Sequence, residues 1–533
     1  MQYCFIVYIY IYIYRREVTL WLSNQHFNYT VDAMAELQRI SHIAEDQAAP
    51  VGIVNIAFKH DEPSKESSPP IINEKPVQLS KEEKRQKKLS IFKNLLVLSF
   101  GFLLLFTAFQ SLSNLQSSIN SAKGLGTASL SVIYGALVLS CMFLPTFMIK
   151  LLTLKYTLIV SMLMYSSYMA ANFYPDWSTL IPTSIILGLG GAPLWTSKCS
   201  YLTHISIEYA QLTGNKVETI VTRFFGIFFM VFQSGQVWGN LIAYKVLQPG
   251  NVSSINESLI SGCGANFCVA ESSSNNTNLE RPSDFKIYLL CGIYTGCSLL
   301  AALFIFIFLD PLKKSEDGKG KPSYGLLIET MRHLKNPHQV LLVPLTIFSG
   351  LEQAYIIGDF TQAFVSCSWG IHNVGYVMIC FGVMDALGSV TLGHLSKITG
   401  RKIIFIATAL SNVGIIILMF LWSPNPDQKV VFFVISGFWG LGDAVWQTQI
   451  NSLYGVLFPK NEEAAFANYR LWESLGFIIA FAYSSSLCIT VKLYILLIVL
   501  VVGMMGYLTI EIRIAAAKKN EISSETKMHS SEQ

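Results

Sequence analysis

The feature that most constrains this sequence is a series of apolar runs, each long enough to cross a lipid bilayer as a helix. About 20 predominantly apolar residues in helical form span the hydrocarbon core. Twelve runs of this kind follow one another, at 91–112, 130–149, 156–173, 179–202, 220–244, 286–309, 339–360, 372–395, 402–422, 429–452, 471–490 and 491–512. None shows the alternating ten-residue pattern of a membrane β-barrel. The runs therefore predict an all-α membrane protein with about twelve transmembrane helices.

Charge is scarce, and the motifs of soluble enzymes are missing. Only 14% of the 533 residues are charged, against roughly 25% in ordinary soluble domains. The net charge of +4 is small, so no nucleic-acid partner is expected. The sequence has no Gly-Lys-Ser or Gly-Lys-Thr phosphate loop, no His-Glu-x-x-His and no Gly-x-Ser-x-Gly. We expect a protein of the lipid bilayer that is not an enzyme and that uses no cofactor and no metal.

The basic residues indicate the orientation. Cytoplasmic loops carry an excess of Lys and Arg, and five of the eight residues 81–88 just before the first run are Lys or Arg while only two are acidic. The central loop, 310–337, is also rich in Lys and Arg. Both termini are therefore expected in the cytoplasm, including a tail at 513–533, in the plasma membrane or, alternatively, an endomembrane. Residues 1–90 form an extension of low complexity that we expect to be disordered, and no function is assigned to it.

The longest loop predicted outside, 247–284, carries signs of a non-cytosolic location. It holds three glycosylation sequons, at Asn251, Asn256 and Asn275. It also holds Cys263 and Cys268, which we expect to form a disulfide with each other or with Cys367, unless they are free thiols. The remaining cysteines, Cys488 among them, lie in apolar runs and are expected to be packing residues.

The chain resembles two repeats of one unit. The fourth run reads Ser-Ile-Ile-Leu-Gly-Leu-Gly-Gly-Ala-Pro-Leu-Trp at 184–195, and the tenth reads Ser-Gly-Phe-Trp-Gly-Leu-Gly-Asp-Ala-Val-Trp at 436–446. These runs are equivalent if six-helix bundles at 91–309 and 338–512 are divided by the central loop. Parallel repeats of this kind are typical of the major facilitator fold. The alternative is a chance recurrence of glycine-rich helices.

A loop motif between the eighth and ninth runs favours the same fold. The superfamily's cytoplasmic loop has Gly, a few residues, Asp-Arg, and then Gly-Arg-Arg or Gly-Arg-Lys. Here Gly393, Gly400, Arg401 and Lys402 match this pattern, whereas the acid and its Arg are replaced. The first-half copy of the motif, near 145–155, is hardly recognisable. The fold is thus expected to be retained while the charges of these loops are not.

Several stretches together resemble the unc-ninety-three (uncoordinated) family, most closely its homolog A branch. They include Leu-Gly-Leu-Gly-Gly-Ala-Pro-Leu-Trp at 187–195, Val-Trp-Gly-Asn at 237–240, Asp-Ala-Val-Trp-Gln-Thr-Gln at 443–449 and Ala-Ala-Phe-Ala-Asn-Tyr-Arg-Leu-Trp-Glu at 464–473. The resemblance covers about 91–512. It implies a facilitator-type protein that regulates a potassium channel or escorts other membrane proteins, with a channel subunit or another membrane protein as its partner. It carries no set of ligand-binding residues.

Acidic side chains inside predicted spans are the candidate functional residues, because ionisable groups are expensive in a bilayer. Four such residues stand out: Glu352, Asp359, Asp385 and Asp443. Gln447 and Asn451 follow Asp443 at helical spacing and extend one polar face. Such a site would suit a proton-coupled secondary transporter of a small solute. The alternative is a set of buried carboxyl groups that hold helices together, and the polar edge of the membrane is a further possibility for Glu352 and Asp359.

Overall fold

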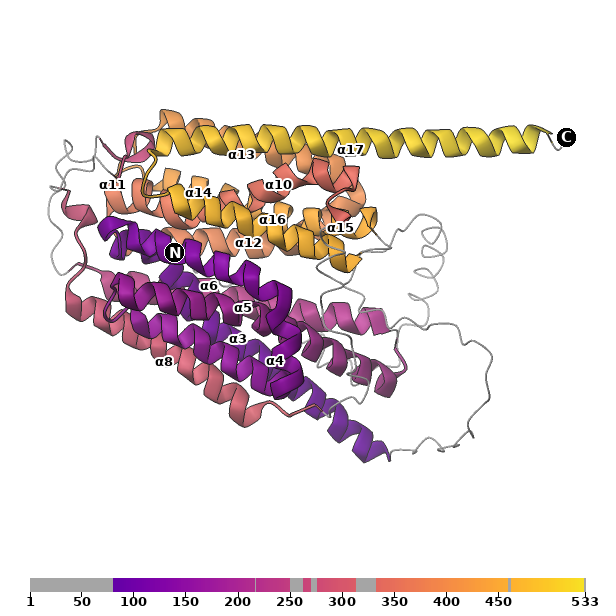
Figure 1. Ribbon diagram of the computed structural model, residues 1–533, viewed down its shortest axis with the longest axis horizontal. Coiled ribbons are helices and arrows are strands. Elements are labelled where there is room, and N and C mark those ends of the chain that lie inside the picture. Colours follow the sequence, from indigo (N-terminus) through magenta and orange to yellow (C-terminus); the bar gives the residue numbers. More distant parts are fainter. Residues whose placement is uncertain are drawn as a thin grey trace, which may run out of the picture. The chain divides into compact units, whose positions relative to one another are not determined.

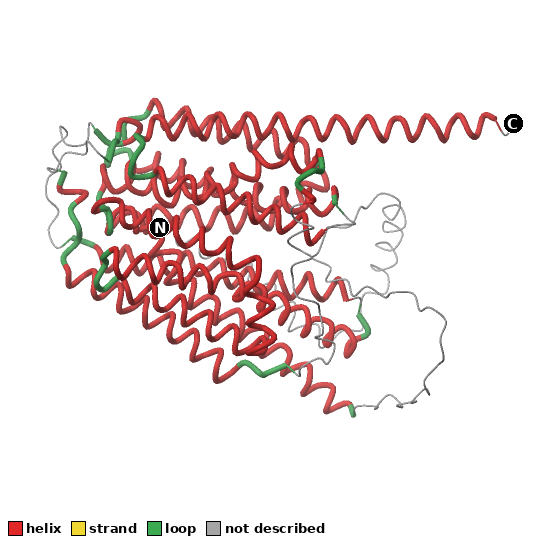
Figure 2. Tube along the Cα trace, viewed as in Figure 1, coloured by secondary structure: helices red, strands yellow, loops and turns green. Residues whose placement is uncertain are grey.

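The computed structural model describes residues 80–215, 217–249, 262–269, 276–312, 332–458 and 462–531. This described part is almost entirely helical and contains no strand (Figure 2). The three sequons at Asn251, Asn256 and Asn275 lie outside the described residues, as do residues 1–79 of the N-terminal extension.

The first half consists of five helices (Figure 1): α3 (Lys81–Ile119), α4 (Leu125–Ala171), α5 (Trp177–Thr213), α6 (Val217–Leu247) and α8 (Asp284–Phe308). Helix α4 contains two of the predicted spans, and its backbone breaks between them at Thr153, which has a φ of +69°. Left-handed backbone is unusual for a β-branched residue, so this position marks a sharp change of direction.

Helix α3 begins ten residues earlier than expected, so the prediction of disorder is wrong for residues 81–90. The reason is a capping box. The Glu83 N–H donates to Ser80 Oγ at 3.2 Å, and the Ser80 N–H donates to Glu83 Oε2 at 2.7 Å. These two bonds satisfy donors that a helix N-terminus otherwise leaves without partners.

The second half is interrupted by two π-helical segments. Its seventh span, which we call span 7, consists of α10 (Pro337–Ala354), the π-helix η4 (Tyr355–Ser366) and α11 (Cys367–Trp369). After α12 (His372–Thr399) and α13 (Arg401–Leu421) comes the tenth span, made of α14 (Lys429–Val445), the π-helix η5 (Trp446–Ile450) and α15 (Asn451–Leu457). The chain ends in α16 (Glu462–Tyr483) and α17 (Ile489–Ser531).

Nine helical segments of the described residues are long and apolar enough to cross a membrane. The other three expected spans coincide with helices α6, α12 and α16, so the number twelve stays a prediction. The last turn was predicted at 490–492 but lies between Tyr483 and Ile489. Helix α17 continues through the predicted tail as far as Ser531, as the long yellow helix of Figure 1 shows.

The helices of the two halves pack in the same order, which confirms the repeat. In the first half α3 contacts α6 and α8, α4 contacts α5, and α4 also contacts α8. The counterparts in the second half are α10 with α16 and α17, α12 with α14, and α13 with α17. The exact boundaries of the two bundles stay a prediction.

Several helix pairs join the halves: α4 with α16, α6 with α12, and α3 with both η4 and α12. Tyr134 of α4 stacks on Phe477 of α16 with ring centroids 4.0 Å apart. At Gly375 of α12, an added Cβ would lie 2.3 Å from the Asn240 carbonyl oxygen of α6. Only glycine allows the two backbones to approach so closely.

Candidate functional site

Three of the predicted acids come together in the second half. Glu352 lies near the end of α10, Asp385 lies on α12 and Asp443 lies on α14. Their exposed fractions are 0%, 9% and 5%, respectively. Trp439 Nε1 of α14 donates to the Glu352 carbonyl oxygen at 3.2 Å, and the electrostatic influence of the three carboxyl groups on one another indicates that they lie near each other. We call these three residues the carboxyl cluster.

Glu352 is the most unusual member of the cluster. No hydroxyl, amide or cationic donor of the described residues reaches either of its carboxyl oxygens, and Asp443 Oδ1 is also without a donor. Two ionised carboxylates in contact repel each other, whereas one shared proton converts the contact into a hydrogen bond. The geometry of the pair therefore suits the binding of one proton.

The π-helical segments position this cluster. Glu352 lies three residues before η4, and Asp443 lies three residues before η5. π-helical insertions are rare and occur frequently at functional sites. Close packing adds to the effect, because a Cβ added at Gly440 of α14 would lie 2.5 Å from the Phe381 carbonyl oxygen of α12. This close approach places α12, which carries Asp385, against α14, which carries Asp443.

Asp385 also connects the cluster to the first half. Its Oδ2 accepts a hydrogen bond from Gln233 Nε2 of α6 at 3.1 Å. This bond crosses the α6–α12 contact between the halves, so any movement of one half against the other at this contact changes the surroundings of Asp385.

A polar network lies beside the cluster. Gln447 Nε2 donates to Ser349 Oγ at 3.1 Å and to Glu473 Oε1 at 2.8 Å. Tyr469 OH donates to the same Glu473 oxygen at 2.9 Å. Arg470 pairs with Glu473 Oε2 at 2.7 Å, and its side chain is 60% exposed while that of Glu473 is 6% exposed. The network therefore joins a buried carboxylate to an accessible cation.

The predicted polar face of the tenth span is only partly formed. Gln447 and Asp443 take part in the site, but the Asn451 side chain donates to the backbone carbonyl of Gln447. The π-helix η5 lies between Asp443 and Asn451 and changes the helical spacing on which that prediction depended.

Asp359 lies apart from the cluster in an ion pair of its own. Its Oδ1 accepts from Lys492 Nζ at 2.7 Å and from Ser484 Oγ at 2.6 Å. The two charged side chains are 2% and 1% exposed. Because Lys492 neutralises it, Asp359 has the geometry of a structural ion pair that joins η4 to the start of α17.

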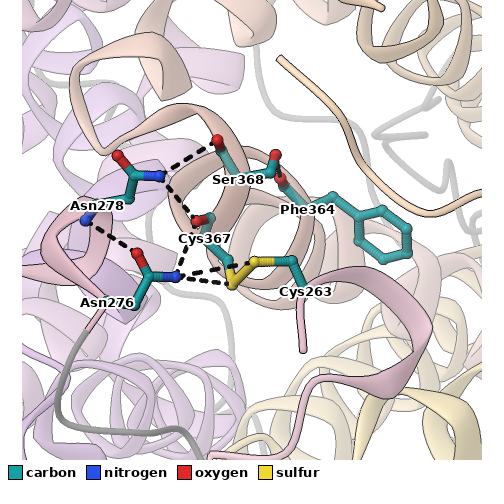
Figure 3. Close-up of a disulfide and its surroundings, with 6 residues drawn as sticks. All are labelled: Cys263, Asn276, Asn278, Phe364, Cys367 and Ser368. Carbon is teal, nitrogen blue, oxygen red and sulfur yellow. Dashed lines mark hydrogen bonds between the residues drawn. A yellow bond between two sulfur atoms is a disulfide. The ribbon is translucent and has the colours of Figure 1, made fainter. Parts of the chain in front are cut away.

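Both loop cysteines form disulfides, but not with each other. Cys263 pairs with Cys367, one of the two partners expected, and Cys268 pairs with Cys488 (Figure 3 shows the first pair). The prediction of a Cys263–Cys268 bond is therefore wrong, and so is the expectation that Cys488 is a packing residue. Cys488 lies in the turn before α17 rather than inside a helix. We call the side of the bundle with these bonds the disulfide side.

The loop motif makes a helix junction. Gly400 has a φ of +83° between α12 and α13, a conformation that favours glycine. Arg401 donates to Glu511 Oε1 of α17 from Nε at 3.0 Å and from Nη2 at 2.7 Å. Lys402 is exposed, and Gly393 lies within α12. The motif thus fixes the start of α13 to α17.

A further ion pair lies at the end of the first half. Asp310, just after α8, accepts from Lys93 Nζ at 2.7 Å, Asn94 Nδ2 at 3.1 Å and Ser90 Oγ at 3.0 Å. Burial acts to raise the pKa of the Asp310 carboxyl, but the hydrogen bonds from Lys93, Asn94 and Ser90 outweigh it and hold the pKa below its usual value.

Sequence reasoning missed one buried cation, Lys198 of α5. It is 1% exposed, and its ammonium lies 4.7–5.4 Å from the ring centroids of Trp195, Phe225, Phe228 and Phe229. Aromatic faces stabilise a cation where water cannot. The position of this lysine inside the predicted span 179–202 is the sequence signal that could have identified it.

Comparison with known proteins identifies the family. The sequence model described as "Ion channel regulatory protein UNC-93" matches residues 116–508. The chain belongs to the UNC-93 family. It is 50% identical over 422 residues to protein unc-93 homolog A of Xenopus laevis (78% of this chain and 92% of that protein) and 48% identical over 425 residues to the Homo sapiens homolog A (79% and 93%).

A third relative carries a functional name. The chain is 37% identical over 442 residues to a protein of Caenorhabditis elegans named for a proposed role as potassium channel regulatory protein unc-93; the match covers 81% of this chain and 62% of that protein. The UNC-93 resemblance expected from the sequence motifs is thus confirmed.

Solved structures confirm the fold. The nucleoside transporter NupG superposes with a TM-score of 0.55 at 13% identity, covering 78% of this chain and 98% of that one. A D-xylose-proton symporter gives a TM-score of 0.54 at 13% identity, covering 79% and 96%. At these identities the likeness concerns the major facilitator fold alone.

Proposed function

We propose that this UNC-93 protein is a regulatory subunit of an ion channel, of the potassium channel type, and that it conducts and transports nothing by itself. The observation that carries the proposal is the family match over residues 116–508, together with the name of the relative from Caenorhabditis elegans. The loop motif, which lacks the acid of the superfamily pattern, and the paired Asp359 support it, because they suit a bundle that holds one arrangement.

The test is purification of the full chain from its native membrane in a mild detergent, followed by identification of what co-purifies. A channel subunit in near-stoichiometric amount supports the proposal. Potassium current is then measured in cells that express this channel with and without the chain. A channel whose current is the same in both cases, despite co-purification, would instead favour an escort that carries membrane proteins between compartments.

A second candidate function is proton-coupled transport of a small solute, and the carboxyl cluster is the observation that favours it. Glu352 and Asp443 are arranged to hold one proton, and Asp385 is bonded across the two halves. Solute binding near the middle of the bilayer between two repeats is how facilitator folds transport.

Transport is tested with the purified chain in liposomes that carry a pH gradient. Asp443→Asn, Asp385→Asn and Glu352→Gln should each abolish proton-coupled uptake, while the exposed Asp427→Asn should not. Equal uptake in all four variants excludes these carboxyls from coupling. A chain without flux of any solute in a broad panel leaves the regulatory role.

We further propose that the disulfide side faces the outside or a lumen and that both termini are cytoplasmic, in the plasma membrane or alternatively an endomembrane. Two disulfides on one side support this orientation, because such bonds persist in oxidising compartments. Enzymatic removal of glycans from the native protein, with Asn251→Gln, Asn256→Gln and Asn275→Gln as controls, tests it.

A further inference from the structure

A short segment of the first half is attached to the second half by both disulfides. The segment comprises residues 262–269 of the loop between α6 and α8, and we call it the strap. Cys263 bonds to Cys367 in α11, the end of span 7, while Cys268 bonds to Cys488, immediately before α17. Through the four residues between its cysteines, the strap forms a covalent path from span 7 to α17.

Backbone contacts hold the strap in place along this path. The Ile489 N–H of α17 donates to the Phe267 carbonyl oxygen at 3.0 Å, and Thr490 Oγ1 donates to the Ala265 carbonyl oxygen at 2.6 Å. Phe267 itself is 3% exposed. At Gly264, φ is +77° and an added Cβ would lie 2.6 Å from Pro424. The strap is therefore a fitted part of the second half.

Two asparagines complete the attachment on the span 7 side, as Figure 3 shows. Asn276 Nδ2 donates to the Cys367 carbonyl oxygen at 3.0 Å, and Asn278 Nδ2 donates to the carbonyl oxygens of Cys367 and Ser368 at 3.2 Å each. These bonds satisfy carbonyl groups at the end of the span 7 helix.

The same two elements are tied a second time, inside the bundle. The ion pair of Asp359 and Lys492 joins η4 of span 7 to α17, and Ser484 accepts from Lys492 through its carbonyl oxygen at 2.6 Å. On its other face span 7 meets α3 of the first half, where Ser118 Oγ and Ser366 Oγ lie 2.8 Å apart. Span 7 thus stands between the first half and α17.

The two disulfides differ in accessibility. Cys263 and Cys367 are 2% and 3% exposed, whereas Cys268 and Cys488 are both half-buried. Thiol–disulfide exchange requires an attacking thiolate to reach a sulfur atom, so exposed bonds are the labile ones. An external reductant should therefore reach the Cys268–Cys488 bond first.

We propose that the Cys268–Cys488 disulfide is a redox-sensitive clamp that fixes span 7 to α17. An external dithiol would break the sulfur–sulfur bond, supply two electrons and two protons, and leave as a cyclic disulfide, while Cys268 and Cys488 become thiols. The strap then stays on span 7 through Cys263–Cys367, but its covalent link to α17 is gone. The end of span 7, η4 and α11, is then attached to α17 by noncovalent contacts alone, among them the ion pair and the hydrogen bonds from Ile489 and Thr490 to the strap, and it gains freedom to move relative to α17. This inference is independent of the proposed channel partner.

The first measurement is a titration of the purified full chain in nanodiscs with dithiothreitol, followed by alkylation and mass spectrometry. Cys268 and Cys488 should become alkylated at reductant concentrations that leave Cys263 and Cys367 oxidised. Reduction of Cys263 and Cys367 first, or of all four together, overturns the assignment of the clamp to one bond.

The second measurement is hydrogen exchange of the same samples at the amides of 355–369. Opening of the clamp should speed exchange there about tenfold, with no change in α13. The double variant Cys268→Ser/Cys488→Ser should exchange as the reduced wild type does, and Cys141→Ser, which removes an exposed free thiol, should exchange as the oxidised one. Unchanged exchange at 355–369 after selective reduction refutes the clamp. If the double variant does not fold, the wild-type titration still decides.

Discussion

The ion pair between Asp359 and Lys492 makes a sharp prediction about stability. Both side chains are almost fully buried, at 2% and 1% exposed, with 2.7 Å between Oδ1 and Nζ. Asp359→Asn or Lys492→Met alone leaves one charge buried without its partner. The double variant Asp359→Asn/Lys492→Met removes both charges and leaves only the Ser484 carbonyl oxygen without its bond from Lys492.

The magnitude follows from the distance. Two unit charges 2.7 Å apart attract by about 6 kcal/mol at an effective dielectric constant of about 20. The cost of taking both ions out of water offsets most of that gain, so the pair contributes little net stability. Loss of one partner, however, typically costs about 3–5 kcal/mol. An unsatisfied carbonyl costs about 1–3 kcal/mol, so the double variant should be more stable than either single variant.

The assay is the free energy of unfolding in mixed micelles, measured as the fraction of a denaturing detergent rises. Lys402→Met, which removes an exposed lysine, serves as the matched control and should change the free energy by less than about 0.5 kcal/mol. The reasoning is refuted if either single variant costs less than about 1 kcal/mol, or if the two single effects add up to that of the double variant.

Three further predictions concern other parts of the chain. Gly350→Ala should destabilise the fold by about 1–3 kcal/mol, because its Cβ would lie 2.0 Å from a carbonyl oxygen of α16. The added Cβ of Gly414→Ala meets nothing within 4 Å, so this variant should be neutral or stabilising in the same unfolding assay. Arg401→Lys should cost about 1 kcal/mol, because one ammonium cannot reproduce both donors of the Arg401–Glu511 pair; a full loss of folding would contradict this. Asp310→Asn should lower the thermal midpoint at neutral pH. The folded pKa of Asp310 lies below its unfolded value. Its contribution is therefore present above a pH of about 4 and is lost as pH falls through the folded pKa. A difference between variant and wild type that does not shrink as the pH is lowered below about 4 would refute the prediction.

The helices could be predicted from the sequence because their signal is local. Twenty apolar residues span a bilayer wherever they occur in the chain, and the expected runs coincide with the observed helices within a few residues in most cases. The π-helical segments could not be predicted, because residue composition does not distinguish a π-helix from the α-helix that it interrupts.

One misplaced turn explains two errors about the disulfide side. The runs 471–490 and 491–512 place the last turn at 490–492, whereas it lies at 484–488. The predicted turn buried Cys488 in a helix and exposed Lys492 in a loop, so neither the disulfide nor the ion pair with Asp359 was foreseen. Both contacts join residues far apart in the sequence, where local composition carries no information about partners.

The residues of the candidate site were likewise identified from the sequence only in part. The rule that ionisable groups inside a membrane are functional candidates selected Glu352, Asp385 and Asp443, which the structure brings near one another; their functional role stays a prediction. The same rule applies to Lys198. Among the described residues it has no carboxylate partner, so its signal lies only in the surrounding aromatic residues, which come from two helices.

The two candidate functions require opposite behaviour of the contacts between the halves. A transporter of this fold rocks its halves against each other, so the hydrogen bond from Gln233 to Asp385 must break and re-form in every cycle, and span 7 must separate from α3 on the disulfide side. A regulatory subunit gains from keeping both contacts, because a fixed surface binds a partner without the entropic cost of ordering itself. The clamp and the buried ion pair both act on span 7 in favour of a fixed arrangement. The carboxyl cluster, in contrast, places a proton-binding pair beside the contact that would have to move. The rigidity of span 7 in the oxidised protein is therefore the property that separates regulation from transport.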